Sequence, residues 1–457
     1  MRLDPQPAPA TPAPTVLKFG GAGLSDGEGV WRACQLVREH GGERPIVVVS
    51  AIGEVTVLLD EALRAAEGGA PDSSRVRLRH KSLLAQLGLP PGLVRRHLSE
   101  LETLLSSVAG RAAVTPAERD HALSLGERMS ARIFAAALRE AGVAATPVDA
   151  WDLGLLSDSD HGHARPLRSA LGEIGRALAR LPGVPVVTGF VAADANGRLT
   201  TLGRSGSDLT ATLLAEAAGA REVQLWKTVG GVMSADPRLV PQARTLRELS
   251  WSQAAALAFH GAGVLHPDAL EPLERARVSA RVLDLDHPDD PGTHIGPVAA
   301  AHGVLGIACR RGVALLRAAS GVHAPPTARP KGLFAALAEH GVEPLALVTG
   351  PGESALVAPD ADPLARLEAR LALRAPTERG LAALALVAAQ AGELAAAAGH
   401  AALARAQITP HLSWIDSARA SALWVLPATQ LAAAACALHE LTLPHPRDRP
   451  ILQRSTP

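Results

Sequence analysis

Residues 200–217, TTLGRSGSDLTATLLAEA, place an arginine, two glycines, two serines and an aspartate directly before an alanine-rich helical pattern. A serine or aspartate N-cap of that helix would explain Ser207 or Asp208. It would not explain Arg204 or the paired glycines. Glycines let a backbone approach a ligand closely, a helix N-terminus offers unpaired N–H groups, and arginine holds a carboxylate or phosphate with two hydrogen bonds. The stretch therefore predicts an anion site, with a plain capped helix as the alternative.

Short apolar strands alternate with longer helical patterns from residue 15 onward, and these elements must position the stretch. The predicted strands are VLKF, PIVVVSAIG, VPVVTGFVA and REVQLWKTVGGV, and the predicted helices include GVWRACQLVREHG and TPAERDHALSLGERMSARIFAAALREAG, the latter as one long helix or two. Such alternation implies a mostly parallel α/β sheet, whose ligands bind at the carboxyl ends of the strands. Each polar cluster follows a strand, which favours a site at that edge.

Turn residues concentrate at 287–297, HPDDPGTHIGP, and predict a domain boundary. Beyond it, the segments GVLGIACRRGVALLRA, KGLFAALAEHGVEPLALVTG and ESALVAP predict a strand, then a helix, a turn and a strand, then a further strand. A similar order recurs in GLAALALVAA, HAALARAQITPHLSWID and SALWVLPA. Two successive βαββ-like units indicate an internal duplication.

The composition excludes several classes of partner. A chain of 457 residues is long enough for two or three domains. Its 45 basic and 45 acidic side chains balance, so no field attracts nucleic acid or an anionic membrane. Cys34, Cys309 and Cys436 show neither metal-ligand spacing nor a disulfide framework, which indicates a reducing cytoplasm. We expect no metal site built from the protein's own ligands.

The N-terminus and the apolar runs predict neither a signal peptide nor a membrane span. Residues 1–14 are rich in Pro and Ala, lack the apolar core of a signal peptide and predict a disordered leader. Apolar runs such as LAALALVAAQAGELAAAA are broken by Gly, Gln and Glu, so we expect no transmembrane helix.

Six segments resemble, in order and in rough spacing, the motifs of the aspartate kinases of the amino acid kinase superfamily. They are VLKFGGAG, VVVSAIGEVTVLL, LSLGERMSAR, TTLGRSGSD, LWKTVGGVMSADPR and AFHGAGVLHP. The resemblance covers about residues 15 to 455, and the C-terminal duplication is similar to the tandem ACT regulatory domains of that family. It implies an amino acid kinase-type sandwich with a mostly parallel sheet over 15–297 and βαββ, ACT-like regulatory modules over 303–457.

The resemblance also implies an activity. Aspartate kinases use ATP with Mg²⁺ to phosphorylate the β-carboxylate of L-aspartate, the first step towards lysine, threonine and methionine. This nucleophile is already ionised at neutral pH, so the protein needs no general base but must position two anions and neutralise the charge between them. The expected partners are L-aspartate, ATP, an amino-acid effector at the ACT-like modules, and further copies of the chain in a homodimer or larger homo-oligomer in the cytoplasm.

Lys18 and Asp208 are the catalytic residues that the resemblance implies. Lys18 ends a predicted strand, and Gly20 and Gly21 beside it would admit phosphate to the backbone. Asp208 would orient Lys18 and the transferring group. A solvated lysine at a strand end is the alternative for Lys18, but lysine is rare in this arginine-rich chain. The lysines are Lys18, Lys81, Lys227 and Lys331.

Four positions match family residues that hold the amino acid. They are Ser50, Thr56, Glu127 and Arg204. Glu127 suits an α-ammonium group and Arg204 an α-carboxylate. Residue type alone would also allow a turn at Ser50, a helix cap at Thr56 and an exposed helical acid at Glu127.

The implied nucleotide-binding residues depart from the family pattern in several places. They are Gly20, Gly21, Lys227, Thr228, Met233, Arg238 and Gly263. Lys227, Thr228 and Met233 stand where the family has Thr, Asp and Tyr, and Gly263 stands where it has Lys. Lys227 either supplies the phosphate charge lost at Gly263, or the chain is a catalytically impaired regulatory homologue.

A superfamily kinase for another small carboxylate is a further alternative. Glu127 together with Arg204 argues against it, because the two would bind both ends of an α-amino acid. In the C-terminal half, the turns VTGPGES and WIDSARAS occupy matching places in the two units. They predict an effector site formed around residues 331–356 and 409–424, with ordinary surface loops as the alternative.

Overall fold

The computed structural model describes residues 12–111, 113–263, 265–297, 303–319, 329–350, 353–370, 376–389 and 392–442. Contacts divide the chain into two compact units. Unit 1 comprises Met1–Gly231 and Leu265–Pro297, and unit 2 comprises Val232–Val264 and Val298–Pro457. Residues 232–264, inside the range predicted for the catalytic domain, therefore pack with the C-terminal part. Of the predicted leader, residues 1–11 lie outside the described residues.

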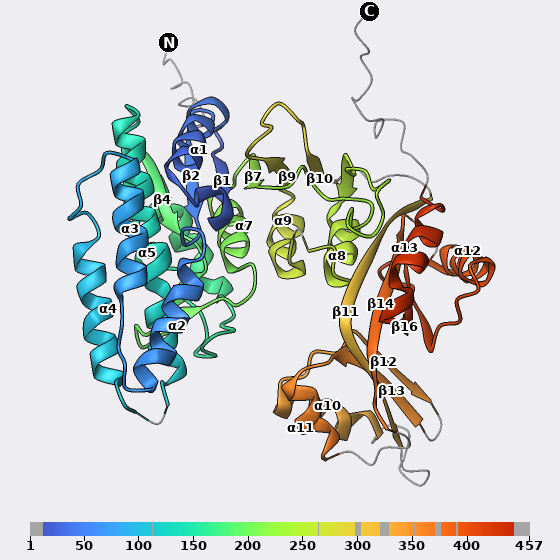
Figure 1. The fold of residues 1–457 in the computed structure, drawn as a ribbon. Helices are drawn as coiled ribbons and strands as arrows, with labels where there is room; N and C mark the ends of the chain where they lie inside the picture. The colour runs from blue at the N-terminus through green and yellow to red at the C-terminus, as the bar shows by residue number, and fades with distance from the viewer. Residues whose placement is uncertain are drawn as a thin grey trace, which may run out of the picture. The chain divides into compact units, whose positions relative to one another are not determined.

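Unit 1 is built on a mostly parallel sheet (Figure 1). Its strands lie in the order β3 (Ala145–Val148), β4 (Val184–Thr188), β2 (Pro45–Val49), β1 (Thr15–Phe19), β7 (Glu222–Lys227), β9 (Ser279–Asp284) and β10 (Thr293–Gly296). All pairs from β3 to β9 are parallel, and β10 runs antiparallel to its neighbour β9. The predicted α/β sheet is confirmed, and the carboxyl ends of β1, β2, β4 and β7 meet at one edge.

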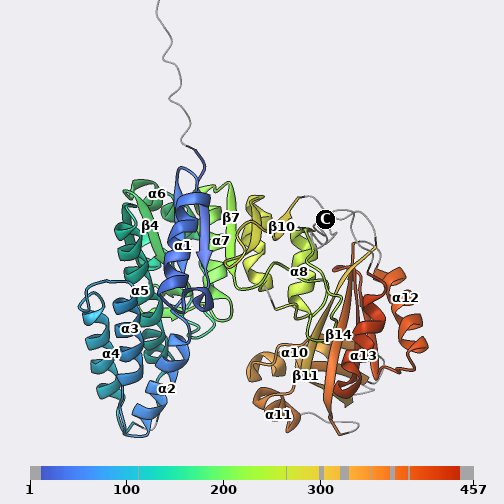
Figure 2. The same ribbon diagram turned by 45° about the horizontal axis from the view of Figure 1, so that its top comes forward.

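The helices of unit 1 follow these strands (Figure 2). They are α1 (Gly27–His40), α2 (Val55–Glu67), α3 (Ser74–Gln86), α4 (Arg95–Val108), α5 (Pro116–Glu140), α6 (Leu171–Arg180), α7 (Gly206–Ala218) and α9 (Glu271–Ala276), with a hairpin of β5 (Val191–Ala193) and β6 (Leu199–Thr201). Helix α5 is one continuous helix. Thr115 and Glu118 form a capping box at its start, with Pro116 at the first helical position.

Alternation along β1 separates the hydrophobic core from the candidate site. Leu17 and Phe19 belong to a core shared with α1 and α5, and the ring of Phe19 stacks on Phe134 of α5 with centroids 5.4 Å apart. Lys18, between them, faces the other way and pairs with Asp208 of α7. Because neighbouring residues of a strand point to opposite faces, the sheet directs Lys18 towards α7.

Unit 2 contains an antiparallel sheet in the order β12 (Ala346–Gly350), β13 (Glu353–Pro359), β11 (Val304–Ala319), β14 (Glu378–Ala388), β16 (Ser421–Pro427) and β15 (Leu412–Asp416). Its helices are α10 (Arg329–His340), α11 (Asp362–Glu368), α12 (Gly392–Arg405) and α13 (Leu431–His439), with β8 (Glu248–Ser250) and α8 (Trp251–Phe259) in the inserted segment. The orders β11–α10–β12–β13 and β14–α12–β15–β16 are the two predicted βαββ units, and β11 pairs with β14 between them. The duplication is confirmed.

Each repeat buries its own helices. Residues of α12 and α13 share a core with β14 and β16, and residues of α10 and α11 share another with β11 and β13.

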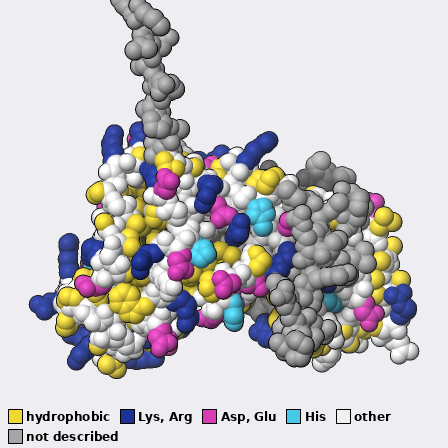
Figure 3. Space-filling model, turned by 90° about the horizontal axis from the view of Figure 1, so that it is seen from above, with side chains coloured by type: hydrophobic (Ala, Val, Ile, Leu, Met, Phe, Trp, Pro, Cys, Tyr) yellow, Lys and Arg dark blue, Asp and Glu magenta, His cyan; other side chains and the backbone are white. Residues whose placement is uncertain are grey.

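The three cysteines, all among the described residues, are unpaired. No described helix combines the length and hydropathy that a membrane crossing requires. On the visible face of unit 1, basic and acidic side chains are interspersed, in keeping with the balanced charge (Figure 3).

Candidate active site

Two glycine turns meet at the carboxyl edge of the unit 1 sheet. Gly21, after β1, lies so close to the turn after β2 that an added Cβ would be 2.4 Å from the carbonyl oxygen of Ala51. The N–H of Gly53 donates to the oxygen of Gly21 at 2.9 Å. An added Cβ at Gly20 would lie 3.6 Å from Lys18 Nζ. Glycine at these positions allows the close contact and leaves the Lys18 ammonium uncovered on that side.

A buried carboxylate lies between two lysines. Asp208, in the first turn of α7, has Oδ1 2.8 Å from Lys18 Nζ and Oδ2 2.8 Å from Lys227 Nζ. The side chains of Asp208, Lys18 and Lys227 are 3%, 8% and 19% exposed. Lys18 and Lys227 come from the neighbouring parallel strands β1 and β7. The cluster carries two positive charges and one negative charge, which suits an anionic ligand.

The electrostatics of the cluster follow from this geometry. Burial opposes ionisation of Asp208, but the charges of Lys18 and Lys227 outweigh it and lower the pKa of its carboxyl group. Burial also lowers the pKa of Lys227, and the charge of Lys18 adds to this effect, while Asp208 opposes it. Asp208 is therefore ionised at neutral pH and holds the two ammonium groups near each other.

The loop before α7 has an unusual backbone. Gly203 and Ser205 adopt positive φ angles of 70° and 54°. An added Cβ at Gly206 would lie 2.8 Å from the ring of Phe190. The alternative of a helix N-cap at Ser207 or Asp208 is wrong: Ser205 occupies that position without a side-chain cap, and Asp208 pairs with lysines instead. Arg204 is exposed, with no hydrogen bond or ion pair to any described residue, so its guanidinium is available to a ligand.

Glu127 is a buried acid in the middle of α5. Its side chain belongs to a residue only 3% exposed, so the exposed helical acid considered from the sequence is ruled out. Its Oε1 accepts a hydrogen bond from the Ala51 N–H at 3.0 Å, and its Oε2 is buried without a hydrogen-bond partner among the described residues. Burial raises the pKa of Glu127 to about 8, although the Ala51 N–H and the charge of Lys18 oppose the shift. A carboxyl group with one free oxygen suits a cationic ligand.

The remaining substrate-side residues lie near the same edge. Ser50 is half-buried directly after β2, and its N–H donates to the Phe19 oxygen at 3.2 Å. Thr56 is half-buried in the first turn of α2, whose N-cap is Glu54, so the helix-cap alternative for Thr56 is wrong. Sequence reasoning could not find the Ala51 N–H at Glu127, because a backbone donor leaves no signal in residue type.

The predicted nucleotide residues fall in both units. Lys227 and the exposed Thr228 belong to unit 1. Met233, Arg238 and Gly263 belong to unit 2, where Met233 Sδ accepts a hydrogen bond from Thr245 Oγ1 at 3.5 Å. Two nitrogens of Arg238 donate to its neighbour Asp236 at 2.8–3.2 Å. Gly263 has a φ of 72°, and an added Cβ would meet only the Gly261 oxygen at 3.8 Å. Their role stays a prediction.

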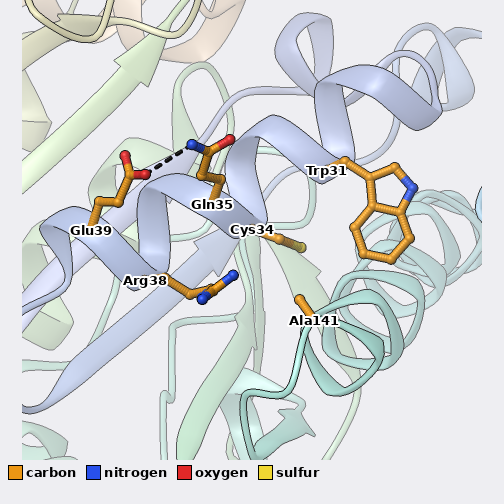
Figure 4. A pocket seen from close by; sticks show the side chains of 6 residues that line it. All are labelled: Trp31, Cys34, Gln35, Arg38, Glu39 and Ala141. Atoms are coloured by element: carbon orange, nitrogen blue, oxygen red, sulfur yellow. Dashed lines mark hydrogen bonds between the residues drawn. The ribbon is translucent and has the colours of Figure 1, made fainter.

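The described residues contain no group of three or more His, Cys, Asp or Glu side chains that could hold a metal ion. A surface pocket lies along α1, lined by Trp31, Cys34, Gln35, Arg38 and Glu39, together with Ala141 after α5 (Figure 4). It contains none of the predicted site residues.

Comparison with known proteins gives consistent matches. The model of the amino acid kinase family matches residues 13–284. Aspartokinase 1, chloroplastic, of Arabidopsis thaliana is 35% identical over 292 residues, which are 61% of this chain and 51% of that protein. The chain thus spans about half the length of this curated relative.

Two solved structures match over nearly their whole length. The crystal structure of Escherichia coli aspartokinase III in complex with aspartate and ADP has a TM-score of 0.82 and 28% identity, covering 93% of this chain and 99% of that one. The same protein in complex with lysine and aspartate has a TM-score of 0.74 and 28% identity, covering 93% and 98%.

Proposed function

The chain belongs to the amino acid kinase family, and from that premise we propose that it is an aspartate kinase. It transfers the γ-phosphoryl group of ATP to the β-carboxylate of L-aspartate and forms 4-phospho-L-aspartate, the first step towards lysine, threonine and methionine. The observation that carries the proposal is the buried cluster of Lys18, Asp208 and Lys227 beside the free carboxyl oxygen of Glu127. This arrangement supports binding of a transferring phosphoryl group together with an amino acid.

In this mechanism the lysines neutralise charge. Lys18 and Lys227 stabilise the negative charge that builds between the two anionic reactants, and Asp208 holds both ammonium groups in position. No general base is required, because the β-carboxylate is already ionised at neutral pH. Gly20 and Gly21 let the phosphates approach the backbone after β1. If Mg²⁺ accompanies the ATP, it would supply further positive charge for the phosphates.

Recognition of aspartate uses both ends of its backbone. Oε2 of Glu127 accepts a hydrogen bond from the α-ammonium group, and Arg204 binds the α-carboxylate. Ser50 and Thr56 offer hydroxyl groups near the ends of β2 and α2. With the α-groups held, the β-carboxylate is left to react. Dependence on two α-groups favours an amino acid over another small carboxylate.

On the nucleotide side, unit 1 contributes Lys227 and Thr228 in addition to the glycines after β1. Met233, Arg238 and Gly263 stay nucleotide-binding predictions from the family resemblance. Lys227 would replace the charge that the family supplies where this chain has Gly263. Its ion pair with Asp208 supports a position near the transferring phosphate. The competing assignment, a catalytically impaired homologue, follows from the same loss of a lysine.

Regulation is assigned to the two βαββ units of unit 2. An amino-acid effector would bind around 331–356 and 409–424, in a homodimer or larger homo-oligomer located in the cytoplasm. The turn WIDSARAS is the β15–β16 connection. Part of VTGPGES, residues 351–352, lies outside the described residues. The structural relative bound to lysine supports testing lysine first, followed by threonine and methionine.

The deciding experiment is a coupled assay for ADP with ATP, Mg²⁺ and L-aspartate, in parallel with hydroxylamine trapping of the acyl phosphate. We expect ADP and hydroxamate to form together only when aspartate is present. L-Glutamate and succinate, which lacks the α-ammonium group, serve as controls. Turnover with succinate but not aspartate would refute the proposal. Nucleotide binding without any turnover would favour the impaired homologue.

A further inference from the structure

Asp120, outside the predicted site, binds two separate segments of unit 1 with one buried carboxylate. It lies in α5 and is 1% exposed. Its Oδ2 accepts hydrogen bonds from His161 Nδ1 at 2.9 Å and from the N–H groups of Gly162 and Thr201, each at 3.0 Å. Its Oδ1 accepts a hydrogen bond from Thr201 Oγ1 at 2.7 Å. Four donors therefore depend on this single charge.

These contacts lie directly before the loop that carries Arg204. Thr201 ends β6, three residues before Arg204, and its oxygen accepts a hydrogen bond from the Ala164 N–H at 2.9 Å. An added Cβ at Gly203 would be 3.3 Å from His163 Nδ1. The segment 161–164 thus lines one side of residues 201–203. The carboxylate of Asp120 hydrogen-bonds to both segments of this contact.

Asp120 also shares a helix with Glu127. The two residues are seven positions apart, about two turns, so they lie on the same face of α5. Helix α5 is continuous and buried along most of its length. It therefore links the group proposed for the α-ammonium to the base of the loop proposed for the α-carboxylate.

We propose that Asp120 is a positioning residue that sets the distance between Arg204 and Glu127 and thereby the affinity for the amino acid. This inference rests on the proposed function. Among the described residues Arg204 has no hydrogen-bond or ion-pair partner that would fix its side chain, so the placement of its backbone decides where the guanidinium can reach. A small displacement of a binding group is sufficient to weaken substrate binding considerably.

Replacing Asp120 by asparagine tests the inference. The amide offers one acceptor oxygen and turns an NH₂ group towards donors, so the four hydrogen bonds cannot all form. We expect Asp120→Asn to raise the KM for aspartate about tenfold, while kcat and the KM for ATP change less than about twofold, because positioning acts on binding of the amino acid.

Asp194→Asn is the matched control. Asp194 is also 1% exposed and accepts hydrogen bonds from Ser159 Oγ, the Asn196 N–H, and the N–H and Nε of Arg198, at 2.8–3.0 Å. Three of these contacts lie within the β5–β6 turn and the fourth comes from Ser159; none involves residues 201–204. Asp194→Asn should lower the melting temperature and leave the KM for aspartate unchanged. Equal increases in KM for both variants would overturn the inference.

A second pair of variants tests the inference even if Asp120→Asn does not fold. Thr201→Val removes only the hydroxyl donor and should raise the KM for aspartate by a few fold, and Thr201→Ser should restore it. Hydrogen exchange of residues 202–208 gives a readout independent of catalysis. Exchange should rise in Asp120→Asn and Thr201→Val but not in Asp194→Asn. Unchanged exchange in Asp120→Asn and Thr201→Val would overturn the positioning role of Asp120. Absence of aspartate turnover in the unmodified protein would instead refute the proposed function.

Discussion

Asp208 and Glu127 are two buried carboxyl groups at the two ends of the candidate site, and their pKa values shift in opposite directions. Asp208 is 2% exposed and Glu127 is 3% exposed, so burial disfavours ionisation in both. Asp208 has two ammonium groups at 2.8 Å, and its pKa falls. Glu127 has one backbone N–H at 3.0 Å, and its pKa rises to about 8. The number of charge partners, and not the burial, decides the difference.

The two ends of the candidate site therefore differ in their charge partners: Asp208 has two ammonium groups, and Glu127 has no cation paired with it among the described residues. The end proposed for the phosphoryl group has its ion pairs in place without substrate, because Asp208 already pairs with both lysines. The amino-acid end lacks a cation, so the α-ammonium group of a substrate would supply the missing partner of Glu127. Removing a charge should therefore reduce turnover at the first end and substrate binding at the second.

Lys18→Ala, which removes one of the two cations paired with Asp208, should have the largest effect of the substitutions, and the effect should be on turnover. We expect kcat to fall roughly a hundredfold to a thousandfold, because a charge aimed at the transition state is lost. Calorimetry should show nearly unchanged binding of aspartate. Lys81→Ala, at an exposed lysine of α3, is the control. Near-full turnover of Lys18→Ala would mean that Lys18 is only a lysine near a strand end.

Arg204→Ala should act on the other end. One charge-assisted contact is worth about 1.5–3 kcal/mol, so the KM for aspartate should rise roughly tenfold to a hundredfold with kcat little changed. Steady-state kinetics with varied aspartate measure this. Arg96→Ala, at an exposed arginine of α4, controls for loss of surface charge. A fall in kcat at constant KM would place Arg204 at the phosphoryl end instead.

Lys227→Ala leaves Asp208 with Lys18 as its single cationic partner and tests whether the second lysine binds the nucleotide. We expect the KM for ATP to rise about tenfold, the loss of one charged contact. Calorimetry with Mg²⁺ and a non-hydrolysable ATP analogue measures binding without turnover. Unchanged nucleotide affinity would favour the impaired homologue.

Restoring a lysine at position 263 tests whether the two positions are coupled. Gly263→Lys should recover part of the loss in the Lys227→Ala background and help little alone, a non-additive result. The recovery should be incomplete because a lysine at a φ of 72° is strained, at a cost on the order of 1–3 kcal/mol. Additive effects would remove the compensation by Lys227.

The pH dependence of aspartate binding should give the smallest effect. Glu127 is mostly protonated below its pKa of about 8, and an α-ammonium group requires the carboxylate form. Aspartate affinity should therefore increase as pH rises, by about fivefold between pH 7 and pH 8 for one linked proton. Calorimetry in buffers of different ionisation enthalpy should detect the released proton. Glu127→Gln should bind more weakly and without this dependence, whereas a pH-independent affinity of the unmodified protein would contradict the prediction.

The sequence alone predicted several of the elements and their order. Alternating strands and helices predicted the mostly parallel sheet, the stretch from Thr115 onward predicted the helix observed as α5, and the recurrence after residue 303 predicted both βαββ units. These features depend on local periodicity and capping, which neighbouring residues determine. Motif order also singled out Lys18, Glu127, Arg204 and Asp208 as candidates.

Only the tertiary structure decided how those residues are paired and charged. The partners of Asp208 lie on β1 and β7, two strands that are far apart in sequence. Residue types could therefore not reveal that Lys227 shares the Asp208 carboxylate with Lys18. The same holds for the Ala51 N–H at Glu127 and for the four donors at Asp120. The ionisation of a buried group depends on desolvation and on nearby charges, and both arise only when the packed sheet and helices bring distant segments together.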